Sequence, residues 1–366
     1  MKSFLASLII LLSTLCNAQS HQETFEDFWT KMDQNYAFFQ LKEIDWQQVY
    51  QNNIDHLDNL TDEEFFQLLV KILEPFEDAH IKLSGTGAKK LTFSGTRPTN
   101  FSNQFGTDSL FRFYDQTVKN YLEANGFSNW SHKGPLLSES KAIYDHHVFE
   151  YSQTEKTGYI KICWFFYDYH RLGLTTLLSD RKHFLSSFED ILEEMNQTDQ
   201  IILDLRNNIG GVSGYPERLA GFFTTKKQVG EYTQTRKKSD HERFSDLKPT
   251  YIQPQNFNYP GSVYLLTNSE TVSASEEFVM MMNILPNVTL IGNNTQGAFS
   301  DVKEVKLKNG WRLSLSNMRF VDLNKVNHEG EGIAPDVSIF NQLEQMKQGN
   351  DEVLAKTFEL IKQKNN

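Results

Sequence analysis

A serine at the junction between a strand-like and a helix-like segment is the residue of this chain best placed to do chemistry. Ser273 follows the apolar run 261–267 and precedes the run 276–282, which has the composition of a helix. Backbone N–H groups in the first turn of a helix have no partner within the helix, and the helix dipole adds partial positive charge there. A hydroxyl at this point can therefore act as a nucleophile beside a site that stabilises an anion.

The same residues also fit a purely structural role. Ser273 and Glu276 have the S-x-x-E spacing of a capping box, in which two side chains satisfy N–H groups at the start of a helix. Taken alone, this motif favours capping, so the catalytic hypothesis depends on the rest of the sequence.

Three further clusters contain residue types that serine chemistry needs. Asp204 ends a continuous apolar run, and the loop after it holds Gly210 and Gly211, where backbone N–H groups can approach a ligand closely. His80 follows a helix-like region, and histidine is well suited to accept a serine proton near neutral pH. Glu329 opens a turn rich in glycine and carboxylates. Taken singly, these clusters are equally typical of a strand-to-loop turn, a surface histidine and a solvated acidic loop.

The four clusters, in this order, resemble the core motifs of peptidase family S41, which includes the tail-specific (carboxy-terminal processing) proteases and the tricorn-like proteases. The matching stretches are ILDLRNN with Gly210-Gly211, TVSASE around Ser273, Leu290-Ile291-Gly292 with Thr295 and Gly297, and Glu329-x-x-Gly332-Ile333-x-Pro335-Asp336. The likeness covers residues 157–340, and the helical start that ends in Asp78-Ala79-His80 looks like the leading region of the tricorn-like branch. The resemblance implies a crotonase- or ClpP-like α/β core and a serine endopeptidase that needs no metal or other cofactor.

The resemblance also implies roles for individual residues. Ser273 matches the nucleophile, His80 the general base of the tricorn-like branch, and Glu329 the carboxylate that orients that base. In the processing proteases the base is a lysine in the turn after the nucleophile helix. Ala298 occupies that position here, which favours His80.

The remaining site residues are expected to supply backbone groups and contacts to substrate. The N–H of Ala274, with one from Gly210 or Gly211, would form the oxyanion hole, and Thr295 and Gly297 are expected to bind substrate. Two positions depart from the family pattern. Ala79 stands where some tricorn-like enzymes have a serine, which leaves no counterpart for a fourth catalytic residue, and Ile209 stands where glycine or proline is commoner.

The periodicity of the chain predicts a helical N-terminal region followed by an α/β core. Apolar residues recur at helical spacing from 23 to 80, and Thr61-x-x-Glu64 predicts the start of a helix. From residue 142 short strands alternate with helices, which predicts partly parallel strands. The expected elements are a hairpin of 147–152 and 158–165, helices over 180–196, 214–224 and 351–362, and strands over 200–205, 261–267 and 288–292.

We therefore predict five segments. These are a leader (1–18), a helical region that carries His80 (19–85), a region of unassigned fold that could serve as a lid (86–141), the catalytic core (142–345) and a C-terminal helix (346–366). Within 86–141 only a helix near 117–124 is expected, and no clear PDZ-like module is visible to capture substrate tails.

Composition restricts the class of partner. The chain has 366 residues, of which 39% are hydrophobic, enough for a large core. Its formal net charge of -11 excludes the positive surface that nucleic acid or an anionic membrane would require at the level of the whole chain. A polypeptide substrate is the expected partner.

The first residues have the pattern of a secretory signal. Lys2 precedes an apolar run over 4–15, and Ala18 ends a small-residue exit suited to cleavage. No later stretch offers about 20 uninterrupted apolar residues, so we expect an exported protein, periplasmic or extracellular, without stable membrane insertion. The alternative is a lipoprotein signal with Cys16 as the acylated residue. Cys163, the other cysteine, lies in an apolar run and is predicted to pack in the core.

Two other functions fit parts of the sequence. A non-catalytic peptide- or lipid-binding protein could use the same scaffold, because fold does not determine function. A metal site around His146 and His147 is the other alternative, but further ligands at suitable spacing are lacking.

Overall fold

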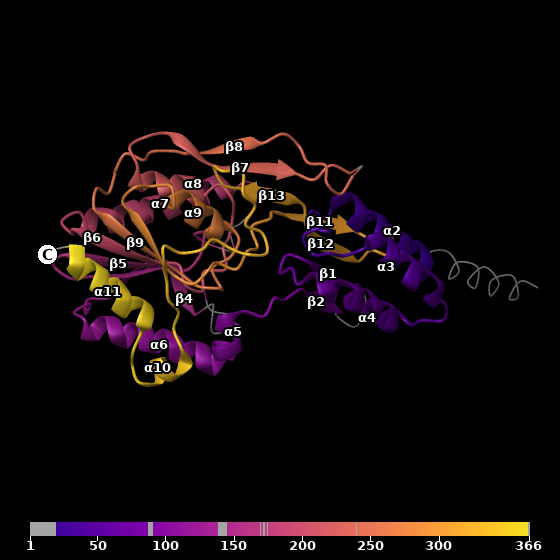
Figure 1. Cartoon of the computed structure of the whole chain (residues 1–366), viewed down its shortest axis with the longest axis horizontal. Helices are drawn as coiled ribbons and strands as arrows, with labels where there is room; N and C mark the ends of the chain where they lie inside the picture. Colours follow the sequence, from indigo (N-terminus) through magenta and orange to yellow (C-terminus); the bar gives the residue numbers. More distant parts are fainter. Residues whose placement is uncertain are drawn as a thin grey trace, which may run out of the picture. The chain divides into compact units, whose positions relative to one another are not determined.

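The computed structural model describes residues 20–86, 91–137, 145–168, 170, 173, 175–238 and 240–364. The leader predicted over residues 1–18 lies outside these residues. The chain forms two compact units (Figure 1). Unit 1 comprises the chain up to Arg97 together with Thr235–Ser245 and Asp301–Met318, and unit 2 comprises Pro98–Gln234, Asp246–Ser300 and the chain from Arg319 onward.

Unit 1 is built from helices and one small antiparallel sheet. Its helices are α2 (His21–Asn35), α3 (Trp46–Asn53) and α4 (Asp62–Leu73), with 3₁₀ turns η1 (Ile54–His56) and η2 (Glu74–Phe76). The sheet has the order β11-β12-β1-β2, formed by β11 (Val302–Lys306), β12 (Arg312–Ser316), β1 (Lys82–Ser84) and β2 (Thr92–Ser94). Buried aromatic rings of the helices, among them Phe25, Phe28 and Phe65, pack with Leu313 and Leu315 of β12. The helical N-terminal region is confirmed, whereas the sheet was not predicted.

The predicted start of α4 is present as a complete capping box. The Thr61 N–H donates to Glu64 Oε2 at 2.8 Å, and the Glu64 N–H donates to Thr61 Oγ1 at 3.3 Å. We expect Thr61→Ala to lower the free energy of unfolding by about 1 kcal/mol, measured by urea denaturation, because one N–H of the first turn loses its acceptor. Thr61→Ser keeps the acceptor and should leave stability close to wild type. Equal losses in both variants would show that the hydroxyl is not responsible.

Unit 2 is organised around a seven-stranded mixed sheet of order β14-β10-β9-β6-β5-β4-β3. Its strands are β3 (Ser131–Leu137), β4 (His146–Gln153), β5 (Thr157–Ile162), β6 (Gln200–Asp204), β9 (Ser262–Thr267), β10 (Val288–Gly292) and β14 (Val337–Ser338). The strands from β5 to β14 run parallel, while β3 and β4 extend the sheet in antiparallel fashion. Every residue of β6 is buried, as expected for a central parallel strand. The predicted hairpin and the three predicted core strands are confirmed.

Helices cover both faces of this sheet (Figure 1). One face packs against α6 (Asp108–Ala124) and α11 (Glu352–Lys364), which share a buried cluster with Tyr159, Ile202 and Tyr264. On the other face α7 (Leu177–Glu194) brings Phe184 and Phe188 against Phe149 of β4. The other helical elements of unit 2 are α5 (Asn100–Phe105), α8 (Pro216–Leu219), η5 (Ala220–Phe223), α9 (Ala274–Met282) and α10 (Leu343–Lys347). This layering confirms the α/β prediction.

Two features of unit 2 differ from the expectation or extend it. The helix expected near 117–124 begins earlier, at Asp108, where Thr107 caps it by accepting the Leu110 N–H. A separate three-stranded sheet of order β13-β7-β8 is formed by β13 (Met318–Val321), β7 (Gln228–Thr235) and β8 (Lys248–Ile252). The strands β7 and β8 follow one another in the chain, whereas β13 comes from a distant segment, which local periodicity does not reveal.

Part of the family motif after β6 holds the fold together. Asp204 accepts hydrogen bonds from Arg206 Nε at 2.9 Å and from the Tyr159 hydroxyl at 2.8 Å. Arg206 also donates to Asp351, immediately before α11, at 2.9 Å. These charged groups are buried and paired, so removing any one of them would leave an uncompensated charge inside the protein. Asp204 and Arg206 thus anchor the C-terminal helix.

Candidate active site

Three loops of unit 2 meet at one edge of the seven-stranded sheet. They follow β6, β9 and β10, which are adjacent and parallel, so the carboxyl ends of these strands lie side by side. The loops contain Gly210 and Gly211, Ser273, and the segment 293–299. This is the edge at which α/β sheets commonly bind ligands.

Direct hydrogen bonds join the first two loops. The Asn268 side chain donates to Asn207 Oδ1 at 2.7 Å and accepts the Asn207 N–H at 3.0 Å. The backbone oxygen of Asn208 accepts both the Val272 N–H at 3.0 Å and the Ser275 hydroxyl at 2.8 Å. The residues on either side of Ser273 are therefore fixed relative to the glycine loop.

Ser273 occupies a strained turn at the start of α9. Its backbone has φ 61° and ψ -127°, a conformation that costs a non-glycine residue about 1–3 kcal/mol and persists only where the surroundings impose it. Its N–H faces two acceptors, the Ala298 backbone oxygen at 3.0 Å and Glu276 Oε2 at 3.1 Å. The expected capping box with Glu276 is present. Capping and access to this position are thus compatible, because Ser273 is only partly buried.

The buried carboxylate of Glu276 accepts most of the hydrogen bonds that hold this turn. Besides the Ser273 N–H, its carboxylate accepts the N–H groups of Gly297 at 2.7 Å and Ala298 at 2.9 Å, and the side chain of Thr295 also hydrogen-bonds to it. Burial raises the pKa of Glu276 to about 7, although these hydrogen bonds act in the opposite direction. The sequence suggested only a capping role for Glu276, but the structure shows that it ties the third loop to the serine turn.

The glycine loop lies directly against Ser273. A Cβ added to Gly210, which has φ 89°, would lie 2.8 Å from Ser273 Cβ and 3.0 Å from the Ala274 nitrogen, so only glycine fits there. The Gly210 N–H donates to Asn208 Oδ1 at 2.8 Å. Among the described residues, no acceptor is found for the N–H groups of Gly211 and Ala274. Of the two glycines considered, Gly211 is therefore the one with a donor to offer an oxyanion.

Glu329 lies in the same unit as Ser273 and contacts the same third loop. It is buried, and its Oε2 accepts the Phe299 N–H at 2.9 Å. The adjacent Gly330 N–H donates to the Gly297 backbone oxygen at 2.7 Å. Segment 297–299 thus connects Glu329 to Glu276 and Ser273.

Thr295 and Gly297 are packed between Glu276 and the turn that follows Glu329. Thr295 is buried, and its hydroxyl accepts the Ile333 N–H at 2.8 Å. Gly297 has φ 80°, and a Cβ there would lie 2.7 Å from the Gly332 nitrogen. Both residues support the loop that binds Glu276, and their contact with substrate stays a prediction.

His80 belongs to unit 1, in the turn between η2 and β1. Its side chain is 12% exposed, and its backbone oxygen accepts the Ser314 hydroxyl at 2.8 Å. Its Nδ1 lies 3.6 Å from Asp78 Oδ1, and the same carboxylate accepts the His80 N–H at 2.8 Å and the Tyr36 hydroxyl at 3.1 Å. Burial alone would raise the pKa of Asp78, but the hydrogen bonds and charge of His80 hold it below its ordinary value.

Asp78 is a candidate that the sequence interpretation passed over. That Glu329 orients the base stays a prediction, and within unit 1 the carboxylate near the imidazole is Asp78, whose Oδ1 lies 3.6 Å from His80 Nδ1. Its position two residues before His80 was the available signal. The pairing of His80 with Ser273 joins residues of two units and belongs to the proposal below.

The fold and the serine turn define a class: an α/β protein with a serine hydroxyl at a helix start, as in serine hydrolases. The model of peptidase family S41 matches residues 156–339, and that of the tricorn protease C1 domain matches residues 17–74. The chain belongs to peptidase family S41.

Individual relatives agree with this assignment. Two probable CtpA-like serine proteases, from Staphylococcus haemolyticus and Staphylococcus epidermidis, are 28% and 29% identical over 139 and 141 residues. These matches cover 38% of this chain and 27% of the length of each relative. One similar solved structure is the crystal structure of a protein from Parabacteroides merdae that is described as a peptidase. Its sequence is 25% identical to this chain and the TM-score is 0.74, and the match covers 93% of this chain and 96% of the other. The structure of mature CPAF in complex with lactacystin has the same fold, with a TM-score of 0.64 and 13% sequence identity. The match covers 94% of this chain and 99% of the CPAF chain.

Proposed function

We propose that this chain is an exported serine endopeptidase that hydrolyses polypeptides through an acyl-enzyme on Ser273. The observation that carries the proposal is the strained backbone of Ser273 at the start of α9, next to Gly210 and followed by the N–H of Ala274, for which no acceptor is found among the described residues. Strain of this kind collects at functional sites, and paired amides at a helix start stabilise a developing oxyanion. Membership of family S41 supports peptide bonds as the target.

In the proposed mechanism His80 is the general base. It accepts the hydroxyl proton while Ser273 Oγ attacks the peptide carbonyl, and the carbonyl oxygen becomes an anion bound by the N–H groups of Ala274 and Gly211. The intermediate collapses, the C–N bond breaks, and the imidazolium gives its proton to the leaving amine. Water, deprotonated by His80, then attacks the acyl-enzyme and releases the acid while Ser273 regains its proton. Asp78 holds the imidazole from the side of Nδ1, and Glu329 is the further carboxylate that the family resemblance assigns to the base.

Export rests on the leader pattern of residues 1–18. No helix in the described part of the chain is long and apolar enough to cross a membrane. We propose a periplasmic or extracellular location on this basis.

A fluorophosphonate probe tests the assignment of the nucleophile. We expect one mole of probe per mole of wild-type protein, located on Ser273 by mass spectrometry, because an activated serine beside two oxyanion donors attacks phosphorus as it would a carbonyl. The Ser273→Ala variant and heat-denatured wild type should remain unlabelled. Absence of labelling in folded wild type, with no hydrolysis of unfolded casein, would overturn the proposal in favour of a binding protein.

A further inference from the structure

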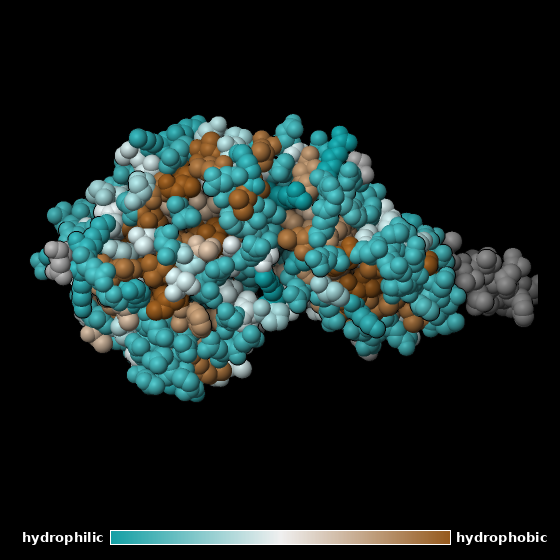
Figure 2. Space-filling model, in the orientation of Figure 1, coloured by the Kyte–Doolittle hydropathy of each residue, from teal (hydrophilic) through white to brown (hydrophobic). Residues whose placement is uncertain are grey.

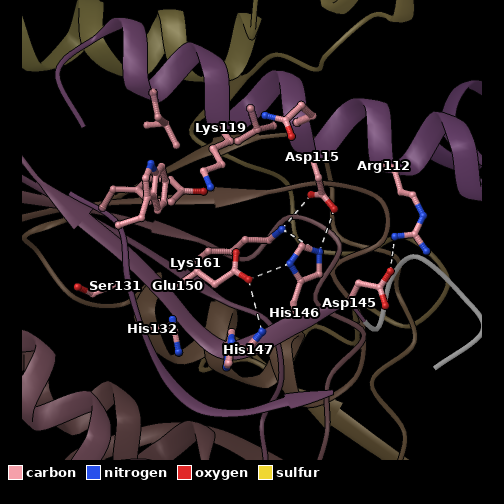
Figure 3. A pocket seen from close by; sticks show the side chains of 15 residues that line it. Arg112, Asp115, Lys119, Ser131, His132, Asp145, His146, His147, Glu150 and Lys161 are labelled. Atoms are coloured by element: carbon pink, nitrogen blue, oxygen red, sulfur yellow. Dashed lines mark hydrogen bonds and ion pairs between the residues drawn. The ribbon is translucent and has the colours of Figure 1, made fainter. Parts of the chain in front are cut away.

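A cavity of about 490 Å³ in unit 2 is lined by charged side chains that pair with one another. Lys161 Nζ and His146 Nε2 each lie 2.9 Å from the Asp115 carboxylate, and Glu150 Oε1 lies 3.1 Å from His146 Nδ1 (Figure 3). Hydrophilic residues cover much of the face shown in Figure 2, where water can hydrate them, whereas buried charges need partners of this kind. Within the described part of the chain, no three potential ligands are grouped to hold a metal ion, so His146 and His147 do not support the metal site considered from the sequence.

A buried carboxylate on α7 has partners of a different kind. Asp180 accepts hydrogen bonds from the backbone N–H groups of Tyr167 at 2.8 Å and Asp168 at 2.7 Å. Its third donor is the hydroxyl of the buried Tyr215, 2.5 Å from Asp180 Oδ1. Burial raises the pKa of the Tyr215 hydroxyl, and the bond to Asp180 acts in the same direction, so this hydroxyl stays a donor. One carboxylate therefore joins segment 165–168 to the chain that follows the glycine loop.

Segment 165–168 is itself bonded to the glycine loop. The Phe165 N–H donates to the Gly210 backbone oxygen at 3.0 Å, and the Phe165 oxygen accepts the Val212 N–H at 2.9 Å. The two backbones are in close contact, because a Cβ added to Gly211 would lie 2.5 Å from the Phe165 oxygen. The position of Phe165 therefore fixes the position of the glycine loop.

The bond between Phe165 and Gly210 also decides which way the Gly211 N–H points. The Gly210 oxygen and the Gly211 N–H belong to one peptide group, and in a trans peptide they point in opposite directions. Because the oxygen faces Phe165, the N–H faces away from it. Gly210 packs against Ser273, since an added Cβ would lie 2.8 Å from Ser273 Cβ. Segment 165–168 thus sets the orientation of a donor that the proposed mechanism assigns to the oxyanion.

We propose that Asp180 is a positioning residue for the oxyanion site, acting through segment 165–168 on the peptide between Gly210 and Gly211. This inference rests on the proposed function, in which that peptide supplies an N–H to the oxyanion. Asp180 takes no part in the chemistry itself. It holds two amides and the Tyr215 hydroxyl, so that the Gly211 N–H is in place before the reaction begins and need not reorganise in the transition state.

Asp180→Asn tests this role with little change in side-chain volume. The asparagine has one acceptor oxygen in place of two, and its NH₂ group then faces at least one of the three donors. We expect kcat for casein to fall about tenfold or more while KM stays within about twofold, because oxyanion donors act mainly on the transition state. Tyr215→Phe removes one donor and keeps both amide bonds, so it should lower kcat only about threefold.

A control variant on the same helix separates positioning from a general loss of stability. The Phe188 ring packs on Phe149, Phe222 and Phe223. Phe188→Leu should therefore lower the free energy of unfolding, measured by urea denaturation, and keep kcat close to wild type. A fall in kcat as large as that of Asp180→Asn would assign the effect to stability and overturn the inference.

Hydrogen exchange of the Phe165 and Val212 amides tests the same coupling without any assay of activity. Both amides bond segment 165–168 to the glycine loop, so they should exchange at least about tenfold faster in Asp180→Asn and at the wild-type rate in Phe188→Leu. Unchanged exchange in Asp180→Asn, or an unchanged kcat, would overturn the inference. Where Asp180→Asn does not fold, by far-UV circular dichroism, Tyr215→Phe provides both measurements with its smaller effects.

Failure of the proposed function would give a different result. Wild type and Ser273→Ala would then hydrolyse casein equally, whatever the state of Asp180. In that case the exchange rates alone decide whether Asp180 holds the glycine loop. If Ser273→Ala is inactive and Asp180→Asn matches wild type in both measurements, the proposed function stands and the role of Asp180 is wrong.

Discussion

Replacing His80 with alanine is expected to lower kcat/KM for an unfolded protein substrate by about 10³-fold or more. In the proposed mechanism, the variant lacks the group that takes the proton of Ser273 and returns it to the leaving amine. Asp78 is buried, and its Oδ1 lies 3.6 Å from His80 Nδ1, so it restricts the orientation of the ring. Initial rates of casein hydrolysis by wild type and His80→Ala, purified in parallel, give the ratio.

Two reference variants make this result decisive. Ser273→Ala sets the floor of the assay, and His80→Ala should fall close to that floor, since residues that act as one unit are not additive. His56→Ala, which alters a histidine of η1 in the same unit, should retain wild-type activity. Full activity in His80→Ala with an inactive Ser273→Ala would mean that another group serves as the base. Equal activity in all variants would refute the assignment of both residues.

Glu276→Gln is expected to lower kcat by about 10²-fold near pH 8. The carboxylate accepts three backbone N–H groups and a bond from Thr295, and a glutamine at this position offers one acceptor oxygen and turns an amide donor toward these donors. The third loop would then shift relative to Ser273, and a displacement of about 1 Å at a reacting group costs rates of this order. Fluorophosphonate labelling should slow by a similar factor in the same variant. If Glu276→Gln reacted at the wild-type rate in both assays, the Glu276 carboxylate would not be what positions Ser273.

The hydrogen bonds that the Glu276 carboxylate accepts are expected to weaken as the pH falls. Because burial raises the pKa of Glu276 to about 7, the carboxylate gains a proton as the pH falls through about 7 and loses acceptor capacity for the Gly297 and Ala298 amides. Hydrogen exchange of segment 295–299, corrected for the intrinsic rate, should therefore speed up below pH 7 in wild type. In Glu276→Gln it should be fast at both pH 6 and pH 8. This measurement reports on Glu276 directly, because Glu276 is the acceptor of the Gly297 and Ala298 amides.

Stability responds to the same proton in the opposite direction. The pKa of Glu276 is about 7 in the folded protein against an ordinary value of 4.5, so the folded state binds the proton more tightly than the unfolded chain. The contribution of Glu276 to stability is therefore largest below pH 4.5 and is lost as the pH rises toward 7. As the pH rises from 4.5 to 7, Glu276 loses its proton, so the serine turn becomes better ordered while the free energy of unfolding falls. Functional sites often combine such local order with a loss of overall stability.

Local sequence pattern was sufficient for most elements of the central sheet. The segment 200–205, with Ile201, Ile202 and Leu203 in succession, has the pattern of a strand buried on both faces, and β6 is found there. Thr61 and Glu64 marked the start of α4 because a capping box is decided by residues three apart. The sheets β11-β12-β1-β2 and β13-β7-β8 were missed for the opposite reason. Pairing such as that of Leu83 with Leu313 depends on contact between segments that are far apart along the chain.

The sequence by itself determined that Ser273 begins a helix and that glycines follow the strand at 200–205, because both features are set by neighbours along the chain. Only the tertiary structure decided how the third loop joins the serine turn: Glu276 takes the N–H groups of Gly297 and Ala298, and Glu329 takes that of Phe299. The physical reason is that a buried donor bonds to whichever acceptor the fold brings within about 3 Å, and that acceptor need not be near in sequence.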